Sequence, residues 1–135
     1  MQAISVLRKL NKDDQVLVSI EYGNLRDSHS ELYTQFIGML LGSTEVVFSA
    51  NRASDFSEKG PIPYSEIDIN QGNGLTTSGT FTAPVSGVYF FHFQGVIGEI
   101  IQKRLNWHRF NLYSASVSIW HNGVEITKSD SVKVR

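Results

Sequence analysis

The four histidines are the residues whose chemistry would be easiest to recognise, as metal ligands or as a general base. They are His29, His92, His108 and His121. No two of them have the His-x-His or His-x-x-x-His spacing that a metal-binding jelly roll of the cupin type would need. The chain has no cysteine, which excludes disulfides, thiolate catalysis and thiolate zinc sites. Since no nucleophile and base are paired either, we expect a protein that is not an enzyme and needs no cofactor.

The histidines have simpler interpretations. His92 alternates with Phe91 and Phe93, so we expect it on a strand, as a polar residue on the face opposite to these aromatic side chains. His29 and His121 fall in segments predicted to be loops or turns, where we expect them to be solvated.

Acidic residues raise the possibility of a calcium site, which needs several converging carboxylate or carbonyl oxygens. They come in pairs within polar segments: Asp13 with Asp14, Asp27 with Glu31, and Asp55 with Glu58. The first pair directly precedes an apolar strand pattern, and we interpret it as a turn.

The clearest basic cluster surrounds a tryptophan: Lys103, Arg104 and Arg109 lie close to Trp107. We expect residues 99–110 to form either a helix or a long loop. Loops on a rigid β scaffold commonly carry recognition, and Trp and Arg are enriched at binding hot spots. Two interpretations stay open: these four residues form a ligand-binding loop, or the aromatic side chain anchors the loop to the core.

The composition describes one globular domain. The chain has 135 residues, of which 41% are hydrophobic and 19% charged. Its formal net charge of −1 argues against a general attraction to nucleic acid or to anionic membranes. No apolar run approaches the ~18 residues of a membrane span, so we expect no membrane insertion. The first residues lack the apolar centre of a signal peptide, and we expect none in this chain.

Short strands separated by turns must position these residues. Residues 16–20 alternate between apolar and polar side chains, which predicts a half-buried strand. Asn122-Gly123 separates residues 116–120 from residues 124–126 and is a strong hairpin signal. Residues 70–74 are a turn cluster suited to positive φ. Strands at this spacing predict an all-β sandwich or jelly roll.

The most specific pattern runs through residues 64–93. Tyr64 is followed at fixed spacings by Asn70, Leu75 and Phe81, and the pattern ends in the run Gly-Val-Tyr-Phe-Phe-His-Phe that starts at Gly87. This pattern resembles the signature of the complement C1q globular-head domain, a jelly roll related to tumour necrosis factor. The resemblance implies a sandwich of about ten strands. Tyr64 stands where the family usually has Phe, and the gap from Leu75 to Phe81 is one residue shorter than expected.

The family's pieces occur in an altered order. Residues 13–18 and 33–41 resemble the family's closing strands, "GDQVWLQV" and "YTTFSGFLL", yet they precede residues 46–50, which resemble the opening "FSA". We interpret the chain as a circular permutant, or as a slice out of register through tandem domains. The predicted single domain, residues 1–135, consists of the closing strands at 1–41, a joining loop at 42–44, and the opening and middle strands at 45–135.

A short joining loop is physically reasonable. The resemblance places the first and last strands of the family side by side, and three residues suffice to join neighbouring antiparallel strands. We therefore predict that residues 35–41 pair beside residues 45–50. The short joint can also favour strand swapping between copies.

The resemblance implies a secreted, non-catalytic homotrimer that binds protein or glycan ligands through loops; a purely structural trimerisation domain is the alternative. Consecutive aromatic residues on a strand point to both sheet faces, so one set fills the core and the other packs against neighbouring subunits. The residues assigned to these two roles are Tyr89, Phe90, Phe91, Phe93 and Phe36.

Some members of the family bind calcium near the trimer axis through the loop that precedes the strand at residues 2–10. In this chain that loop is cut open, which leaves Asp130 as the calcium candidate.

Overall fold

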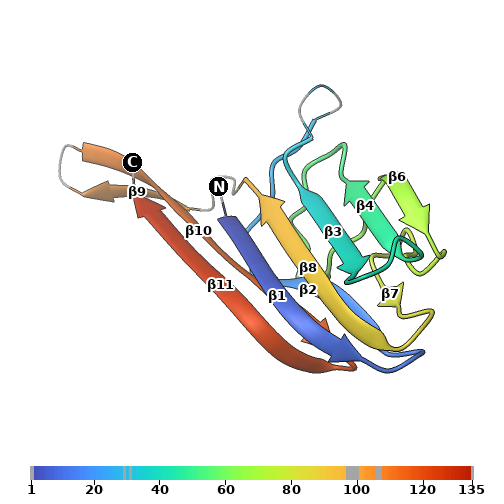
Figure 1. The fold of residues 1–135 in the computed structure, drawn as a ribbon. Helices are drawn as coiled ribbons and strands as arrows, with labels where there is room; N and C mark the ends of the chain where they lie inside the picture. Colours follow the sequence, from blue (N-terminus) through green and yellow to red (C-terminus); the bar gives the residue numbers. More distant parts are fainter. Residues whose placement is uncertain (1, 29, 31, 97–100, 106–107, 135) are drawn as a thin grey trace.

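The computed structural model describes residues 2–28, 30, 32–96, 101–105 and 108–134; for 101–105, 108–114 and 130–134 it describes the backbone alone. Within these residues the chain forms eleven strands (Figure 1). They are β1 (Gln2–Leu10), β2 (Gln15–Tyr22), β3 (Gln35–Leu40), β4 (Val47–Asn51), β5 (Gly60–Pro61), β6 (Glu66–Gln71), β7 (Phe81–Thr82), β8 (Gly87–Gly95), β9 (Ile101–Leu105), β10 (His108–His121) and β11 (Val124–Val134).

The strands form two antiparallel sheets that pack face to face. The front sheet has the order β1-β8-β3-β4-β6. The back sheet has the order β11-β10-β2-β5, with β7 pairing with β2 and β9 with β10. The predicted all-β jelly-roll sandwich is therefore confirmed. Among the described residues, no helix has the length and apolar character needed to cross a membrane.

Aromatic side chains from the front sheet fill the space between the sheets. On β8 the side chains of Tyr89, Phe91 and Phe93 are fully buried, as is Phe36 on β3. Phe90 points to the opposite, outer face of the front sheet and is half-buried. The aromatic strip thus divides between the two faces of the sheet, because successive side chains of a strand alternate.

Close packing in the core also restricts the residue type at one position, Gly38. Gly38 on β3 lies against the ring of Phe48 on β4, and a Cβ at this position would overlap that ring. The glycine is therefore needed for close packing rather than for an unusual backbone angle.

The segments on either side of residues 42–44 pair as predicted. Strands β3 and β4 are antiparallel, in a register that runs from Gln35 opposite Asn51 to Met39 opposite Val47. Gly42, with φ of +83°, makes the turn between them.

The predicted hairpin at Asn122-Gly123 is also present. Both residues have positive φ, 49° and 80°, as a two-residue turn between twisted strands requires. This turn joins β10 to β11, and β10 also pairs with β2.

The prediction of a helix or long loop over residues 99–110 is wrong for the part that the structure describes. Strand β9 instead pairs with the first part of β10, from His108 opposite Leu105 to Leu112 opposite Ile101. β10 continues beyond the body of the sandwich (Figure 1), and β9 gives this extension a hydrogen-bonded partner.

Candidate functional site

Three segments from distant parts of the chain meet at one end of the sandwich. Arg26, in the loop after β2, donates its backbone N–H to the carbonyl of Val96 at the end of β8, at 2.9 Å. Leu25 and Phe56 exchange two backbone hydrogen bonds, at 2.8 and 3.0 Å. Both of these side chains are buried, so apolar packing and hydrogen bonds together hold the loop after β2 against the loop after β4.

A buried carboxylate fixes the loop after β2 from within. The carboxylate of Asp27 accepts hydrogen bonds from the backbone N–H and the hydroxyl of Thr34, at 2.7 and 2.6 Å. Asn51 on β4 donates its side-chain amide to the carbonyl of Thr34 at 3.3 Å. Burial raises the pKa of Asp27, and the hydrogen bonds from Thr34 oppose that rise.

A buried arginine fixes the loop after β4. The Arg52 side chain is 8% exposed, and its guanidinium carbon lies 4.7 Å from the ring centre of Phe56. Burial lowers the pKa of Arg52, while the nearby charge of Asp27 raises it. The guanidinium donates to three backbone carbonyls, those of Ser54, Asp55 and Pro63.

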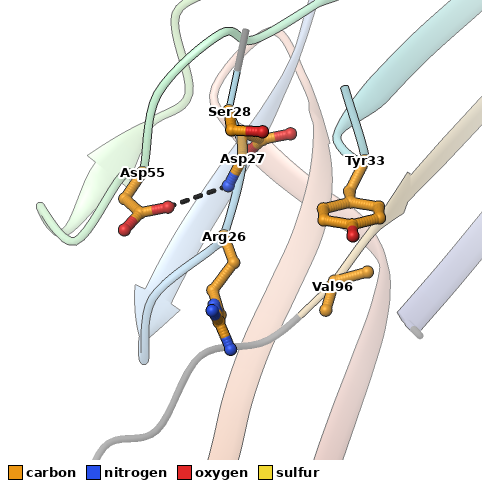
Figure 2. Close-up of a pocket in the computed structure, with 6 residues that line it drawn as sticks. All are labelled: Arg26, Asp27, Ser28, Tyr33, Asp55 and Val96. Carbon is orange, nitrogen blue, oxygen red and sulfur yellow. Dashed lines mark hydrogen bonds between the residues drawn. The ribbon is translucent and has the colours of Figure 1, made fainter. Parts of the chain in front are cut away.

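These loops line an open cavity of about 290 Å³, which Figure 2 shows. A hydrogen bond of 2.8 Å from the backbone N–H of Asp27 to one carboxylate oxygen of Asp55 ties two of its walls together. The cavity offers a guanidinium, a carboxylate, a hydroxyl and an aromatic ring on preformed walls. Its lining residues are Arg26, Asp27, Ser28, Tyr33, Asp55 and Val96.

Sequence reasoning missed this cavity and considered its acidic residues only as calcium ligands. In the described part of the chain, no three His, Cys, Asp or Glu side chains group as a metal site would require. Both carboxylate oxygens of Asp27 already accept hydrogen bonds from Thr34. No spacing in the sequence signals the cavity, because Asp27 and Asp55 stand 28 residues apart. The polarity of both loops was the one available clue.

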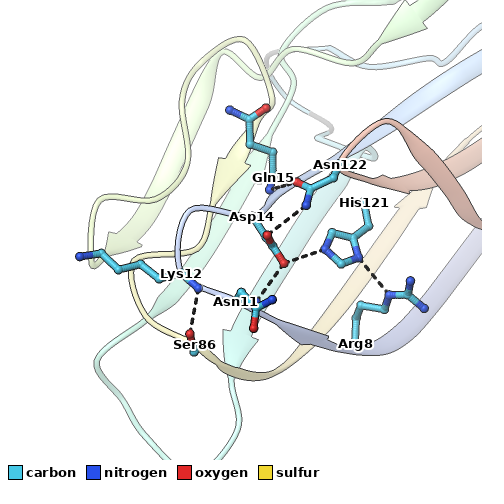
Figure 3. A network of polar contacts seen from close by, with 8 residues as sticks. All are labelled: Arg8, Asn11, Lys12, Asp14, Gln15, Ser86, His121 and Asn122. Carbon is cyan, nitrogen blue, oxygen red and sulfur yellow. Dashed lines mark hydrogen bonds and ion pairs between the residues drawn. The ribbon is translucent and has the colours of Figure 1, made fainter.

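A second polar network lies at the opposite end of β8 (Figure 3). His121 Nε2 lies 3.0 Å from a carboxylate oxygen of Asp14, and Arg8 Nε donates to His121 Nδ1 at 3.1 Å. Because Nδ1 accepts from a cation, Nε2 carries the ring proton and donates it to Asp14. The second ring nitrogen thus faces an arginine and not a nucleophile, so the network does not have the arrangement of a catalytic triad.

The hydrogen bonds of the network stabilise the ionised form of Asp14. They lower its pKa to about 2, with the side-chain amide of Asn122 contributing most, followed by the backbone N–H of Asn11 and by His121. The turn interpretation of Asp14 fits its position just before β2. The prediction of a solvated His121 in a loop is wrong, because His121 ends β10 and its side chain is only 14% exposed. Contacts with residues distant in sequence cover it.

The described residues of the predicted recognition loop lie on two paired strands. Lys103 and Arg104 lie in β9 and Arg109 lies in β10, directly opposite Arg104. Their side chains, and Trp107 as a whole, lie outside the described residues. The calcium candidate Asp130 lies in β11 opposite Ser116, and its side chain is likewise outside the described set.

His29 and Glu31 also fall outside the described residues. His92 has the predicted position on the outer face of β8. Its Nδ1 lies 2.8 Å from the hydroxyl of Ser5, and its Nε2 lies 3.2 Å from the amide oxygen of Gln94.

Exposed apolar side chains gather on the outer face of the front sheet. Leu7 on β1 and Met39 on β3 both stand opposite Phe90 in the sheet register. Leu41 donates its backbone N–H to the carbonyl of Val88 at 2.9 Å, which brings these two residues beside the row. We call these five residues the outer patch: Leu7 (60% exposed), Leu41 (46%), Val88 (43%), Met39 (36%) and the half-buried Phe90.

The sequence matches a known family over more than half of its length. The family model for the C1q domain matches residues 47–129, which include β4 to β8 and the β10–β11 hairpin turn. Residues 1–46, with β1, β2 and β3, lie outside the match. Searches of characterised proteins and of solved structures found no match.

Proposed function

Because the chain belongs to the C1q domain family, we propose that it is a homotrimeric recognition module. Domains of this family are non-catalytic and typically trimeric. In the proposal, three copies pack through the outer patch, and the loops at the ends of each sandwich bind ligands. The ligands are proteins or glycans. The family is usually extracellular, and we propose secretion for the parent protein.

The outer patch is the observation that carries the proposal of a trimer. Four of its side chains stand on three hydrogen-bonded strands, β1, β8 and β3, on the face turned away from the core, and Leu41 directly follows β3 and bonds to Val88. Contiguous exposed apolar surface of this kind marks an interaction site in a soluble protein. Burying it against other copies would contribute roughly 25 cal/mol for each Å² of apolar surface.

The test replaces two exposed members of the patch with charges. We expect the Leu7→Lys, Met39→Lys variant to fall from three copies to one in light scattering and to keep the circular dichroism spectrum of the parent. Val124→Lys is the matched control, because Val124 is 62% exposed on the back sheet and lies outside the patch. A parent protein with the monomer mass of 15.1 kDa at micromolar concentration would contradict the proposal.

Ligand recognition is tested on glycan and protein arrays at a concentration where the trimer persists. Three weak sites on one rigid body gain avidity without new contacts, so the trimer should bind an array more tightly than the patch variant does. Absence of binding on both arrays would favour a structural assembly domain.

Two further proposed sites have their own tests. Alanine substitution of Lys103, Arg104, Trp107 and Arg109 tests the proposed basic ligand surface. A comparison of calcium-dependent melting between the parent and Asp130→Asn tests the proposed calcium site.

We also propose that the chain is circularly permuted relative to its family. The pairing of β3 with β4 supports this, since it places residues 35–40 beside the first strand of the matched segment. So does β1, which completes the front sheet beside β8 although it lies outside the match.

The permutation has a direct test by rearrangement. The side-chain amide of Gln2 donates to the carbonyl of Ser129 at 2.7 Å, so β1 starts beside the middle of β11. A flexible linker of about ten residues from the chain end to Gln2 can span the remainder of β11, at roughly 3.3 Å per residue. With the chain opened at Ser43, we expect an equally folded protein whose stability changes by about 1 kcal/mol, because closure entropy varies slowly with loop length. A rearranged chain that does not fold would contradict the permutation.

A further inference from the structure

We propose that the cavity between Arg26, Tyr33 and Asp55 binds one neutral sugar ring of a glycan. This inference rests on the proposed recognition function and gives it a site and a ligand class. The cavity lies on loops beside Val96, after the last residue of β8, whereas the outer patch that the trimer would bury surrounds Val88 and Phe90 near the start of that strand.

Arg26 and Asp55 carry opposite charges, and both line this cavity without pairing to each other. Across the described residues, the ion pairs join Lys59 to Glu21 and His121 to Asp14, and neither involves Arg26 or Asp55. One oxygen of Asp55 accepts the backbone N–H of Asp27, which orients the carboxylate and leaves its second oxygen turned away from that bond (Figure 2). Both charged groups are therefore available to a ligand.

The charges of the cavity select against most classes of ligand. An anion would lie against Asp55 and Asp27, and a cation would lie against Arg26. An apolar molecule would remove water from the charged groups without replacing their hydrogen bonds, which is costly. A hydroxyl group both donates and accepts, so adjacent hydroxyls can donate to Asp55 and accept from Arg26.

The other lining groups fit the same ligand. Ser28 adds a hydroxyl, while the ring of Tyr33 and the side chain of Val96 add apolar surface for the C–H groups of a sugar. At about 290 Å³ the cavity is at the small end of ligand sites, so it suits one ring rather than a buried oligosaccharide.

The walls are set before a ligand arrives. Asp27 is held by Thr34, and Arg52 holds the backbone of the loop that carries Asp55. Loops that are already ordered lose little conformational freedom on binding. For one exposed site of this kind we expect a dissociation constant on the order of 1 mM, which three copies in one trimer would tighten on a multivalent glycan.

The experiment titrates the full chain with the methyl glycosides of glucose, galactose and mannose, followed by saturation-transfer NMR and calorimetry. We expect at least one of them to bind at millimolar concentration, and glucuronic acid, glucosamine and glycine each to bind at least about ten times more weakly. Asp55→Asn keeps an oxygen for the Asp27 N–H but loses the charge, so it should weaken binding roughly tenfold. Arg26→Gln should weaken it similarly. Asp68→Asn, at an exposed carboxylate on β6, is the matched control and should change nothing.

Three results would overturn the sugar site: none of the neutral glycosides binds, glycine or a charged sugar binds as well as they do, or Asp55→Asn and Arg26→Gln bind them as the parent does. The mass of the assembly and the protein array are measured on the same preparations. A trimer that binds a protein while the glycoside titration fails leaves the proposed function intact. A monomer that is silent on both arrays contradicts the proposed function itself.

Discussion

An aspartate stabilises the loops at each end of strand β8, and the pKa values of these two aspartates are shifted in opposite directions. At the cavity end, Asp27 is buried, and loss of solvent raises its pKa. At the other end, Asp14 lies near the surface, and hydrogen bonds from Asn122, Asn11 and His121 lower its pKa to about 2. The carboxylate of Asp27 thus accepts hydrogen bonds inside a loop, and that of Asp14 accepts several hydrogen bonds at the surface.

The comparison shows why only one end has groups left for a ligand. In the network end, Asp14, His121, Arg8 and Asn122 bond to one another. In the cavity end, the groups that hold the loops lie behind the wall, which leaves the side chain of Arg26 facing the cavity. At the cavity end, buried hydrogen bonds hold the loops, so polar side chains at the surface remain free to bind a ligand. At the network end, the surface side chains already bond to one another.

The largest expected effect is at the buried support. Asp27→Ala should lower the free energy of unfolding by about 2–3 kcal/mol, because it leaves the N–H and the hydroxyl of buried Thr34 without their partner. Chemical denaturation measures the loss. Asp27→Asn can keep both contacts and should lose much less. Equal losses in the two variants would show that the charge, and not the hydrogen bonds, supports the loop.

The second effect concerns the buried arginine. Arg52→Met keeps apolar contact with Phe56 but removes the donors to three backbone carbonyls, so we expect a loss of about 2 kcal/mol in denaturant unfolding. Arg52→Lys should lose nearly as much, because a single ammonium cannot reproduce the planar fork of a guanidinium. A fully stable Arg52→Lys variant would mean that the charge alone holds this loop.

A smaller effect is expected at the network end. Asn122→Ala should cost about 1 kcal/mol in thermal unfolding, because alanine tolerates the positive φ of 49° poorly and cannot bond to Asp14. Asn122→Gly removes the same side chain but accepts the backbone angle, so the difference between the two variants isolates the turn. If the two variants have the same melting temperature, the loss of stability comes from the side-chain hydrogen bonds and not from the backbone angle.

The smallest expected effect is on the pH dependence of the free energy of unfolding, to which Asp14 and Asp27 contribute with opposite signs. The lowered pKa of Asp14 stabilises the fold above its ordinary value of 3.8, and this contribution is lost as the pH falls to about 2. The raised pKa of Asp27 has the opposite sign: it opposes folding above the folded-state pKa and ceases to do so on acidification. Between about pH 6 and about pH 2, Asp14→Asn should therefore lose less stability than the parent, and Asp27→Asn should lose more. Parallel unfolding curves for all three proteins would contradict the assigned pKa directions.

Some features were predictable from the sequence because they depend on near neighbours along the chain. Alternation on β8 assigned Phe91 and Phe93 to one face and His92 to the other, since a strand has a period of two. The turn at Asn122-Gly123 needed only two residues that tolerate positive φ. The family pattern in residues 64–93 likewise depends on spacing alone and identified the fold.

The cavity, the polar network and the β9–β10 hairpin were decided only by the tertiary structure. Asp27 meets Asp55 across 28 residues, and His121 meets Asp14 across 107, through strand order and register that local patterns do not encode. The sequence alone therefore determined which side chains face the core and which family the fold resembles. Which loops meet at each end, and hence which charges remain for a ligand, depended on the packing of the whole sandwich.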